Sequence, residues 1–305
     1  MVATPMTQSE MDGNLKLLAR GKVRDLYEID EGTLLFVATD RISAYDVIMG
    51  NGIPDKGALL TLLSAHWFEY LRSTVPGLRT HFKSLDLPSS VPQHLHPKLQ
   101  DRSMQVRKLK IFPIEAIVRG YITGSAWKEY KSKGTVHGIL MPSGMKESEA
   151  FPQNAIYTPS TNAEAGHNDE NIHPDEAARI VGEKYAKRIE DLALKLYMTA
   201  RAYALERGII IADTKFEFGL DTETDEVVLV DEVLTPDSSR FWLTSNYKIG
   251  QPQESFDKQY LRDWLTSNGL KGKQGVHMPE DVVRNTGEKY KEAFERLVGR
   301  KWEAA

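Results

Sequence analysis

The sequence contains no cysteine. This excludes disulfide bonds, thiolate metal sites and a cysteine nucleophile, and it fits a reducing compartment, so we expect a cytoplasmic protein. Long apolar runs are also missing: the longest clean run, residues 209–212, is far too short to cross a bilayer. The N-terminal residues have neither a basic region nor an apolar one, so we expect no secretory signal.

A charge excess of one sign is missing as well. The 305 residues include 39 Lys and Arg against 43 Asp and Glu, a formal net charge of −4. Because non-specific nucleic-acid binding requires a broad basic surface, we expect no nucleic-acid partner, and we expect no membrane partner either. The composition, 41% hydrophobic and 27% charged, is that of a globular protein with one large domain or two ordinary ones. Nothing in it indicates an obligate interface, and we expect a monomer.

Turn signals and hydrophobic periodicity divide the chain into two parts. Residues 15–48 alternate short apolar runs with glycine turns, which predicts an antiparallel meander. Residues 106–112 are typical of another strand, and Pro113 follows as a plausible joint. We therefore predict a β-rich domain over residues 1–112 and an α+β domain over residues 113–305.

Helices and one hairpin characterise the second part. The spacing of apolar residues predicts a short helix over 125–133 and a single long amphipathic helix over 175–207, closed by Gly208. Residues 209–219 and 227–234 are β-rich runs on either side of a short acidic turn. This pattern predicts a β-hairpin.

The hairpin carries the clearest candidate chemistry. Because side chains alternate along a strand, Asp213, Lys215 and Glu217 share one face. Reflection through the turn places Glu217 near Val230, so that Asp231 lies across from Glu217 within one residue of register. Two partly buried carboxylates repel each other, and a divalent cation removes that conflict; Mg²⁺ prefers oxygen ligands and phosphates. The hairpin is a candidate Mg²⁺–nucleotide platform, with a solvated strand face as the alternative.

Three further segments contain residue types that suit anions. Ser239 and Arg240 follow the hairpin and combine a hydroxyl with a guanidinium, although a capped turn with a surface arginine is favoured if the segment is taken alone. Residues 119–125 place glycines and hydroxyls directly before a predicted helix, where free N–H groups bind anions; a helix cap is the alternative. The glycine turn at residues 20–24, with Lys22 after the glycine, is a weaker signal for polyphosphate, and an ordinary hairpin turn is favoured if the segment is taken alone.

Five segments, taken in order, give the chain a specific resemblance. They read GKVRDLY at 21–27, DRISAYD at 40–46, VRGYITGS at 118–125, ADTKFEFG at 212–219 and VDEVLTPDSSR at 230–240. Together they resemble the signature blocks of the phosphoribosylaminoimidazole-succinocarboxamide synthase (SAICAR synthetase) family, in its single-function fungal form. The blocks cover nearly the whole chain.

The resemblance implies a kinase-like, two-lobed α+β fold with ATP between the lobes. It also implies an ATP-dependent ligase that joins L-aspartate to the carboxylate of carboxyaminoimidazole ribotide, giving SAICAR, ADP and phosphate in purine biosynthesis, through an acyl phosphate. Two alternatives remain open: a small-molecule kinase with the same Mg²⁺–ATP platform, and a nucleotide-binding regulatory module without turnover.

Roles for the residues that carry the cofactor and the chemistry follow from the resemblance as hypotheses. The ATP phosphates are expected to meet the glycine turn, formed by Gly21, Lys22, Val23 and Arg24. Mg²⁺ is expected between Glu217 and Asp231. Lys215 is expected to stabilise the moving phosphoryl group, and Asp213 to orient the aspartate amine or accept its proton.

Substrate binding is expected at polar residues of four segments. The ribotide phosphate and carboxylate are expected to meet hydroxyls and guanidiniums, namely Arg119, Ser125, Ser239 and Arg240. The segment with Ser43 and Asp46, together with the loop 160–172, is expected to line the side of the cleft that receives the ribotide and aspartate. The expected partners are therefore small molecules.

Overall fold

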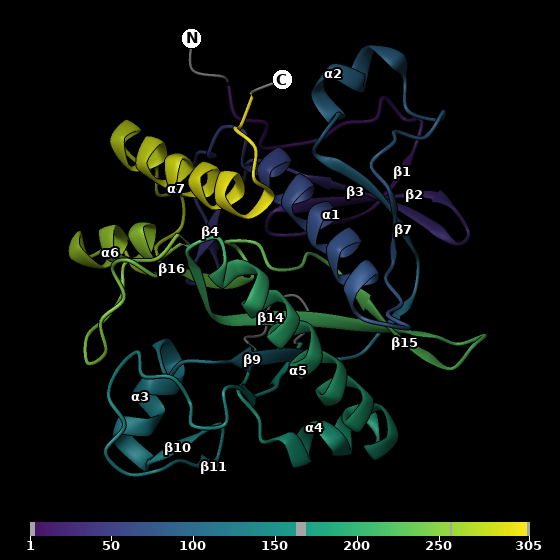
Figure 1. Cartoon of the computed structure of the whole chain (residues 1–305). Coiled ribbons are helices and arrows are strands. Elements are labelled where there is room, and N and C mark those ends of the chain that lie inside the picture. The colour runs from purple at the N-terminus through teal and green to yellow at the C-terminus, as the bar shows by residue number, and fades with distance from the viewer. Residues whose placement is uncertain (1–3, 163–168, 257, 304–305) are drawn as a thin grey trace.

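The computed structural model describes residues 4–162, 169–256 and 258–303. Two antiparallel sheets, joined and covered by helices, give the α+β class that the sequence predicts (Figure 1). In the parts of the chain just given, no helix combines the length and the apolar character that crossing a membrane requires.

The first sheet contains the predicted meander. Its strands, in spatial order, are β1 (Lys16–Arg20), β2 (Arg24–Asp30), β3 (Thr33–Ala38), β7 (Ser103–Arg107) and β6 (Phe82–Ser84). Beside it, β4 (Ser43–Ala44) and β5 (Val47–Ile48) form a small ribbon. In β3, Leu35 and Val37 pack into one small core, whereas Leu34 and Phe36 pack toward the main core. The sheet is thus covered on both faces, which explains the apolar run in its sequence.

The second sheet is built around one long central strand. Its strands are β14 (Ile209–Asp221), β15 (Glu226–Val230), β16 (Ser239–Leu243), β9 (Ile114–Arg119), β8 (Lys110–Ile111), β12 (Ile156–Tyr157) and β13 (Ser160–Thr161). β14 pairs with β9, β16, β15 and β8, so it contacts a neighbour on both edges. This position buries the apolar start of β14 completely and holds the polar side chains that follow it at fixed heights in the sheet.

Helices connect and cover the sheets. They are α1 (Lys56–Thr74), α2 (His96–Leu99) with a 3₁₀ turn at Gln93–Leu95, α3 (Gly124–Lys133), α4 (Pro174–Val181), α5 (Glu183–Leu205), α6 (Gln259–Ser267) and α7 (Glu280–Val298). α1 contacts β3 and β7 of the first sheet and also α5 and α7, while α5 covers β14 and β9. α3 lies with the β10 (Thr135–Val136) and β11 (Ile139–Leu140) hairpin at one end of the molecule (Figure 1).

Two predicted elements are wrong in their extent. The single helix predicted over 175–207 is two helices, because Gly182 adopts φ 88° and ψ 142°, a conformation that breaks the helical hydrogen-bond ladder. The strand predicted over 106–112 is also two elements: β7 ends in the first sheet and β8 begins in the second. The chain therefore passes between the sheets at residues 108–109, and the domain division at Pro113 stays a prediction.

Gly120, in the segment that the sequence suggested for anions, has a packing role. A Cβ atom at this position would lie 1.9 Å from the hydroxyl of Tyr197. Tyr197 is fully buried in α5, and its hydroxyl donates a hydrogen bond to the carbonyl oxygen of Ile211 in β14 at 2.7 Å. Only glycine lets α5 approach the sheet so closely here.

We predict that Gly120→Ala destabilises the fold, because the buried Tyr197 ring has no room to retreat. The free energy of unfolding should fall by roughly 1–3 kcal/mol, the usual cost of overpacking. Gly32→Ala is the matched control, since its Cβ would have no neighbour closer than 3.9 Å. Urea unfolding of both variants checks this, and equal stability of the two would refute the packing role.

Candidate active site

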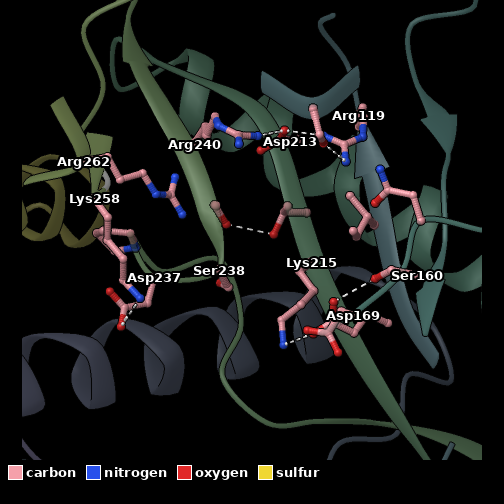
Figure 2. Close-up of a pocket in the computed structure, with 17 residues that line it drawn as sticks. Arg119, Ser160, Asp169, Asp213, Lys215, Asp237, Ser238, Arg240, Lys258 and Arg262 are labelled. Carbon is pink, nitrogen blue, oxygen red and sulfur yellow. Dashed lines mark hydrogen bonds and ion pairs between the residues drawn. The ribbon is translucent and has the colours of Figure 1, made fainter. Parts of the chain in front are cut away.

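A polar cleft opens where β9, β14 and β16 meet the start of α6. Its inner part has a volume of about 250 Å³ (Figure 2), and its outer part, of about 610 Å³, extends to the turn after β1 and to the β4 ribbon. Lys215, Arg240 and Lys258 line both parts, so the two volumes adjoin.

Lys215 is the centre of an acidic cluster in this cleft. Its Nζ atom forms an ion pair with Glu217, lies 3.0 Å from Glu115 Oε1, and lies 4.0 Å from Asp231 Oδ2. Glu217 follows two residues later on the same strand face, and Val230 is its partner across the hairpin, which is the register that the sequence predicted. Glu217 and Asp231 therefore converge on one ammonium group.

Arg24 reaches the same cluster from the first sheet. Its Nη2 atom lies 2.9 Å from Asp231 Oδ1 and 3.1 Å from Glu232 Oε1, and its side chain is only 13% exposed. Together with Glu115 and Glu217, these side chains amount to four carboxylates against the two cations Lys215 and Arg24. The cluster carries two negative charges in excess when all its groups are ionised.

Burial and this charge balance shift the pKa values of the cluster. Burial raises the pKa of Glu217, and the Asp231 carboxylate adds to this shift, although Lys215 opposes it. Burial lowers the pKa of Lys215, but the neighbouring carboxylates outweigh it and hold the pKa well above its usual value. Burial also raises the pKa of Asp231, but Arg24 and Lys215 outweigh it and lower that pKa. Of these three groups, Glu217 is therefore the one whose pKa is shifted toward the uncharged form.

A second cluster, with an excess of positive charge, lies along the same strand face. Asp213 Oδ2 accepts a hydrogen bond from Arg119 Nη1 at 2.9 Å and another from Arg240 Nη1. Sheet register brings them together, since Asp213 is paired with Arg119 on β9 and with Arg240 on β16. Figure 2 shows the two guanidiniums on either side of the carboxylate. Two cations against one anion favour a negatively charged ligand here.

The buried imidazole of His137 contacts the guanidinium of Arg119. Its Nδ1 atom lies 2.8 Å from the carbonyl oxygen of Pro159, and its Nε2 atom lies 3.4 Å from Arg119 Nη2. A carbonyl oxygen only accepts, so Nδ1 carries the proton and Nε2 accepts from the guanidinium. Burial, together with the charge of Arg119, lowers the pKa of His137 to about 4. The imidazole is therefore neutral at physiological pH.

Most of the residues predicted from the sequence line this cleft. The outer part is lined by Lys22, Val23, Arg24, Ser43, Asp46, Ser125, Lys215, Asp231 and Arg240. The inner part is lined by Arg119, Ser125, Asp213, Lys215, Ser239 and Arg240. Of the residues predicted individually for the site, Gly21 and Glu217 are not in the lining: Gly21 forms the turn, and Glu217 lies against Lys215. Residues 163–168 of the predicted loop fall outside the described residues.

The sequence interpretation did not single out several residues of the cleft. Glu115 was missed although it alternates with Arg119 along β9, a period-two signal that was available. Lys258 and Arg262 lie four residues apart at the start of α6, one helical turn, and both line the cleft. For Asp237, the sequence pattern predicted only a turn. Its two lysine partners are described below, and one of them is distant in the sequence.

Comparisons with known proteins agree on one family. The family model described as SAICAR synthetase matches residues 17–279. Phosphoribosylaminoimidazole-succinocarboxamide synthase of Saccharomyces cerevisiae is 59% identical, over 97% of this chain and 99% of that protein. A solved structure described as SAICAR-synthase from Saccharomyces cerevisiae complexed with SAICAR is similar with a TM-score of 0.88 and 56% identity, over 98% of this chain and 100% of that one.

A more distant structure is similar as well. It is described as SAICAR synthetase (Type-2) in complex with ADP, and it has a TM-score of 0.69 and 26% identity over 94% of this chain and 99% of that chain.

The lowered pKa of His137 predicts a pH dependence of stability. As the pH falls from the ordinary value of 6.5 toward about 4, the unfolded state binds the proton before the folded state does. The contribution of His137 is thus complete above pH 6.5 and lost on acidification. The stability difference between wild type and His137→Gln should shrink by up to about 3 kcal/mol over this range. Urea unfolding at a series of pH values checks this, and a difference that does not change with pH would contradict it.

Proposed function

The chain belongs to the SAICAR synthetase family, and from this premise we propose how its cleft carries out the reaction. The reaction is the ATP-dependent ligation of L-aspartate to the carboxylate of carboxyaminoimidazole ribotide, which gives SAICAR, ADP and phosphate in purine biosynthesis. One observation carries the proposal: an acidic cluster around Lys215 and a cationic cluster around Asp213 lie side by side on one strand, facing one cleft.

The reaction needs such a pair of sites. A carboxylate is a poor acyl donor at neutral pH, and transfer of the γ-phosphoryl group of ATP onto it creates an acyl phosphate that an amine can attack. The step requires the phosphoryl donor and the carboxylate to be held in line and their negative charges to be compensated. Lys215 lines both parts of the cleft, and we assign it the stabilisation of the phosphoryl group in transit.

The acidic cluster fits Mg²⁺ by its donor set. Its two excess negative charges match one divalent cation, and we propose that Glu217 and Asp231 hold it. Among the described residues no group of three or more His, Asp or Glu forms a ready metal cage. This suits Mg²⁺, which takes one or two carboxylates and completes its coordination with water and substrate phosphates. Once bound, the ion would neutralise charge on the ATP phosphates.

The residues of the turn after β1 have different roles in the proposed binding of ATP. Lys22 is half exposed at the rim of the outer cleft and forms an ion pair with Asp46. We propose that Lys22 exchanges this partner for the ATP phosphates, which the backbone at Gly21 and Val23 then covers. Arg24 is buried against Asp231 and Glu232, so we assign it the orientation of the carboxylates rather than a phosphate contact.

The cationic cluster fits the anionic groups of the ribotide. We propose that Arg119 and Arg240, with Ser125 and Ser239, bind its phosphate and carboxylate, and that Ser43 and Asp46 lie on the aspartate side. Asp213 is 5% exposed, and its Oδ2 atom already accepts from both guanidiniums. We therefore assign Asp213 the positioning of these two arginines, rather than the role toward the aspartate amine that the resemblance implied.

The setting that we propose is a cytoplasmic monomer acting on small molecules, without nucleic acid or membrane. The weakly acidic composition and the absence of cysteine support it.

A phosphate-release assay tests the function against the kinase alternative. With ATP, Mg²⁺ and the ribotide, we expect sustained phosphate release only when L-aspartate is present, together with SAICAR in equal amount. An acyl phosphate that forms on the enzyme needs the amine for turnover, whereas a kinase leaves a stable phosphorylated product without any amine. Accumulation of phosphorylated ribotide in the absence of aspartate would overturn the ligase assignment.

A further inference from the structure

Behind the inner cleft, one buried carboxylate binds three donors. Asp237 Oδ1 accepts a hydrogen bond from the hydroxyl of Tyr290 at 2.6 Å, and Oδ2 accepts one from Lys56 Nζ at 2.8 Å. Lys258 Nζ lies 3.3 Å from the same Oδ2 atom. Figure 2 shows Lys258 and Asp237 in contact on the cleft wall, beside Arg262.

The donors come from distant parts of the chain. Lys56 begins α1 and its side chain is 0% exposed, and Tyr290 lies in α7 and is 1% exposed. Asp237 and Lys258 line both parts of the cleft, whereas Lys56 and Tyr290 are not among its described lining residues. The cluster thus connects two buried side chains to one cation at the cleft surface.

Stability alone is a poor explanation of Lys56. An ammonium at the first residue of a helix lies at the positive end of the helix dipole. Burial lowers the pKa of Lys56 even though Asp237 opposes this shift. A buried ion pair of this kind gains little stability over an apolar pair of similar size. The buried ammonium of Lys56 is therefore unfavourable for stability. A role in the function of the cleft would explain why a lysine stands at this position.

We propose that Lys56 and Tyr290 are positioning residues that act through Asp237 on Lys258 and so set the affinity of the cleft for its anionic substrate. Two ammonium groups share one carboxylate, so the three groups together carry one positive charge in excess, and Lys258 is the cation among them that lines the cleft. Without Lys56, Asp237 and Lys258 form a neutral pair. Without the Tyr290 hydroxyl, the carboxylate loses the bond that fixes its Oδ1 atom. This inference rests on the proposed ribotide site.

Steady-state kinetics of Lys56→Met and Tyr290→Phe test the proposal, with Arg240→Ala as the reference for the ribotide site. We expect the ribotide KM to rise roughly tenfold in Lys56→Met and about threefold or more in Tyr290→Phe. The kcat and the ATP KM should stay within about twofold of wild type, because neither residue contacts the reacting groups. If Lys56→Met does not fold, Tyr290→Phe decides the question.

Two variants control for a general loss of structure. Tyr203→Phe removes a hydroxyl that donates to the carbonyl oxygen of Leu297 in α7 at 2.8 Å. Arg102→Met breaks an ion pair of 3.0 Å with Asp40, which also accepts hydrogen bonds from the backbone N–H groups of Gly57 in α1 and of Met6. Neither residue lines the described cleft, and both variants should keep the wild-type ribotide KM.

The outcomes separate the positioning role from the ribotide site. An unchanged ribotide KM in Lys56→Met and Tyr290→Phe, with a raised KM in Arg240→Ala, would overturn the positioning role and leave the site intact. An unchanged KM in all three variants would reject the ribotide site and the positioning role with it. An equal rise in the two control variants would also overturn it, since the effect would then be structural.

Discussion

The ammonium group of Lys215 is the interaction on which the rest of the site depends. It is the shared counter-ion of carboxylates from β9, from β14 and from the residue after β15. Arg24 adds a second cation from the other sheet. Arg24 thus connects the first sheet to carboxylates that follow β15 of the second sheet. The two cations together leave two negative charges uncompensated, which favours a divalent cation. One charged cluster thus takes part both in the contact between the sheets and in the proposed function.

The central position of β14 makes this arrangement possible. A strand paired on both edges has fixed side-chain heights, so polar residues two positions apart face one cleft at defined spacing. Asp213 and Lys215 are such neighbours, and each gathers opposite charges: Asp213 two guanidiniums, Lys215 several carboxylates. An anion site and a cation site result within one strand face, which is what phosphoryl transfer between two anionic reactants requires.

The features that could be predicted from the sequence are those set by local periodicity. The hairpin register, which puts Glu217 opposite Val230, follows from a short turn and period-two alternation. The break at Gly182 could not be predicted, because a single glycine within an amphipathic pattern is tolerated in many helices. The same holds for the split between β7 and β8, where consecutive apolar residues belong to different sheets.

Contacts between distant segments were the hardest to foresee. Lys56 and Asp237 are 181 residues apart, and each alone is an ordinary surface residue type. Their pairing depends on how α1 packs behind the cleft, which no local pattern specifies. Arg119 and Arg240 could be predicted as site residues because they belong to the five family blocks. Lys56 and Lys258 lie outside those blocks.

The claim that Glu217 and Asp231 bind Mg²⁺ with ATP is tested most directly by calorimetric titration of ATP with excess Mg²⁺ and with EDTA. Wild type should bind ATP roughly tenfold more tightly or better with Mg²⁺. Glu217→Gln and Asp231→Asn should lose most of this gain, whereas Asp225→Asn, in the exposed turn of the same hairpin, should keep it. An undiminished Mg²⁺ effect in both site variants would contradict the account.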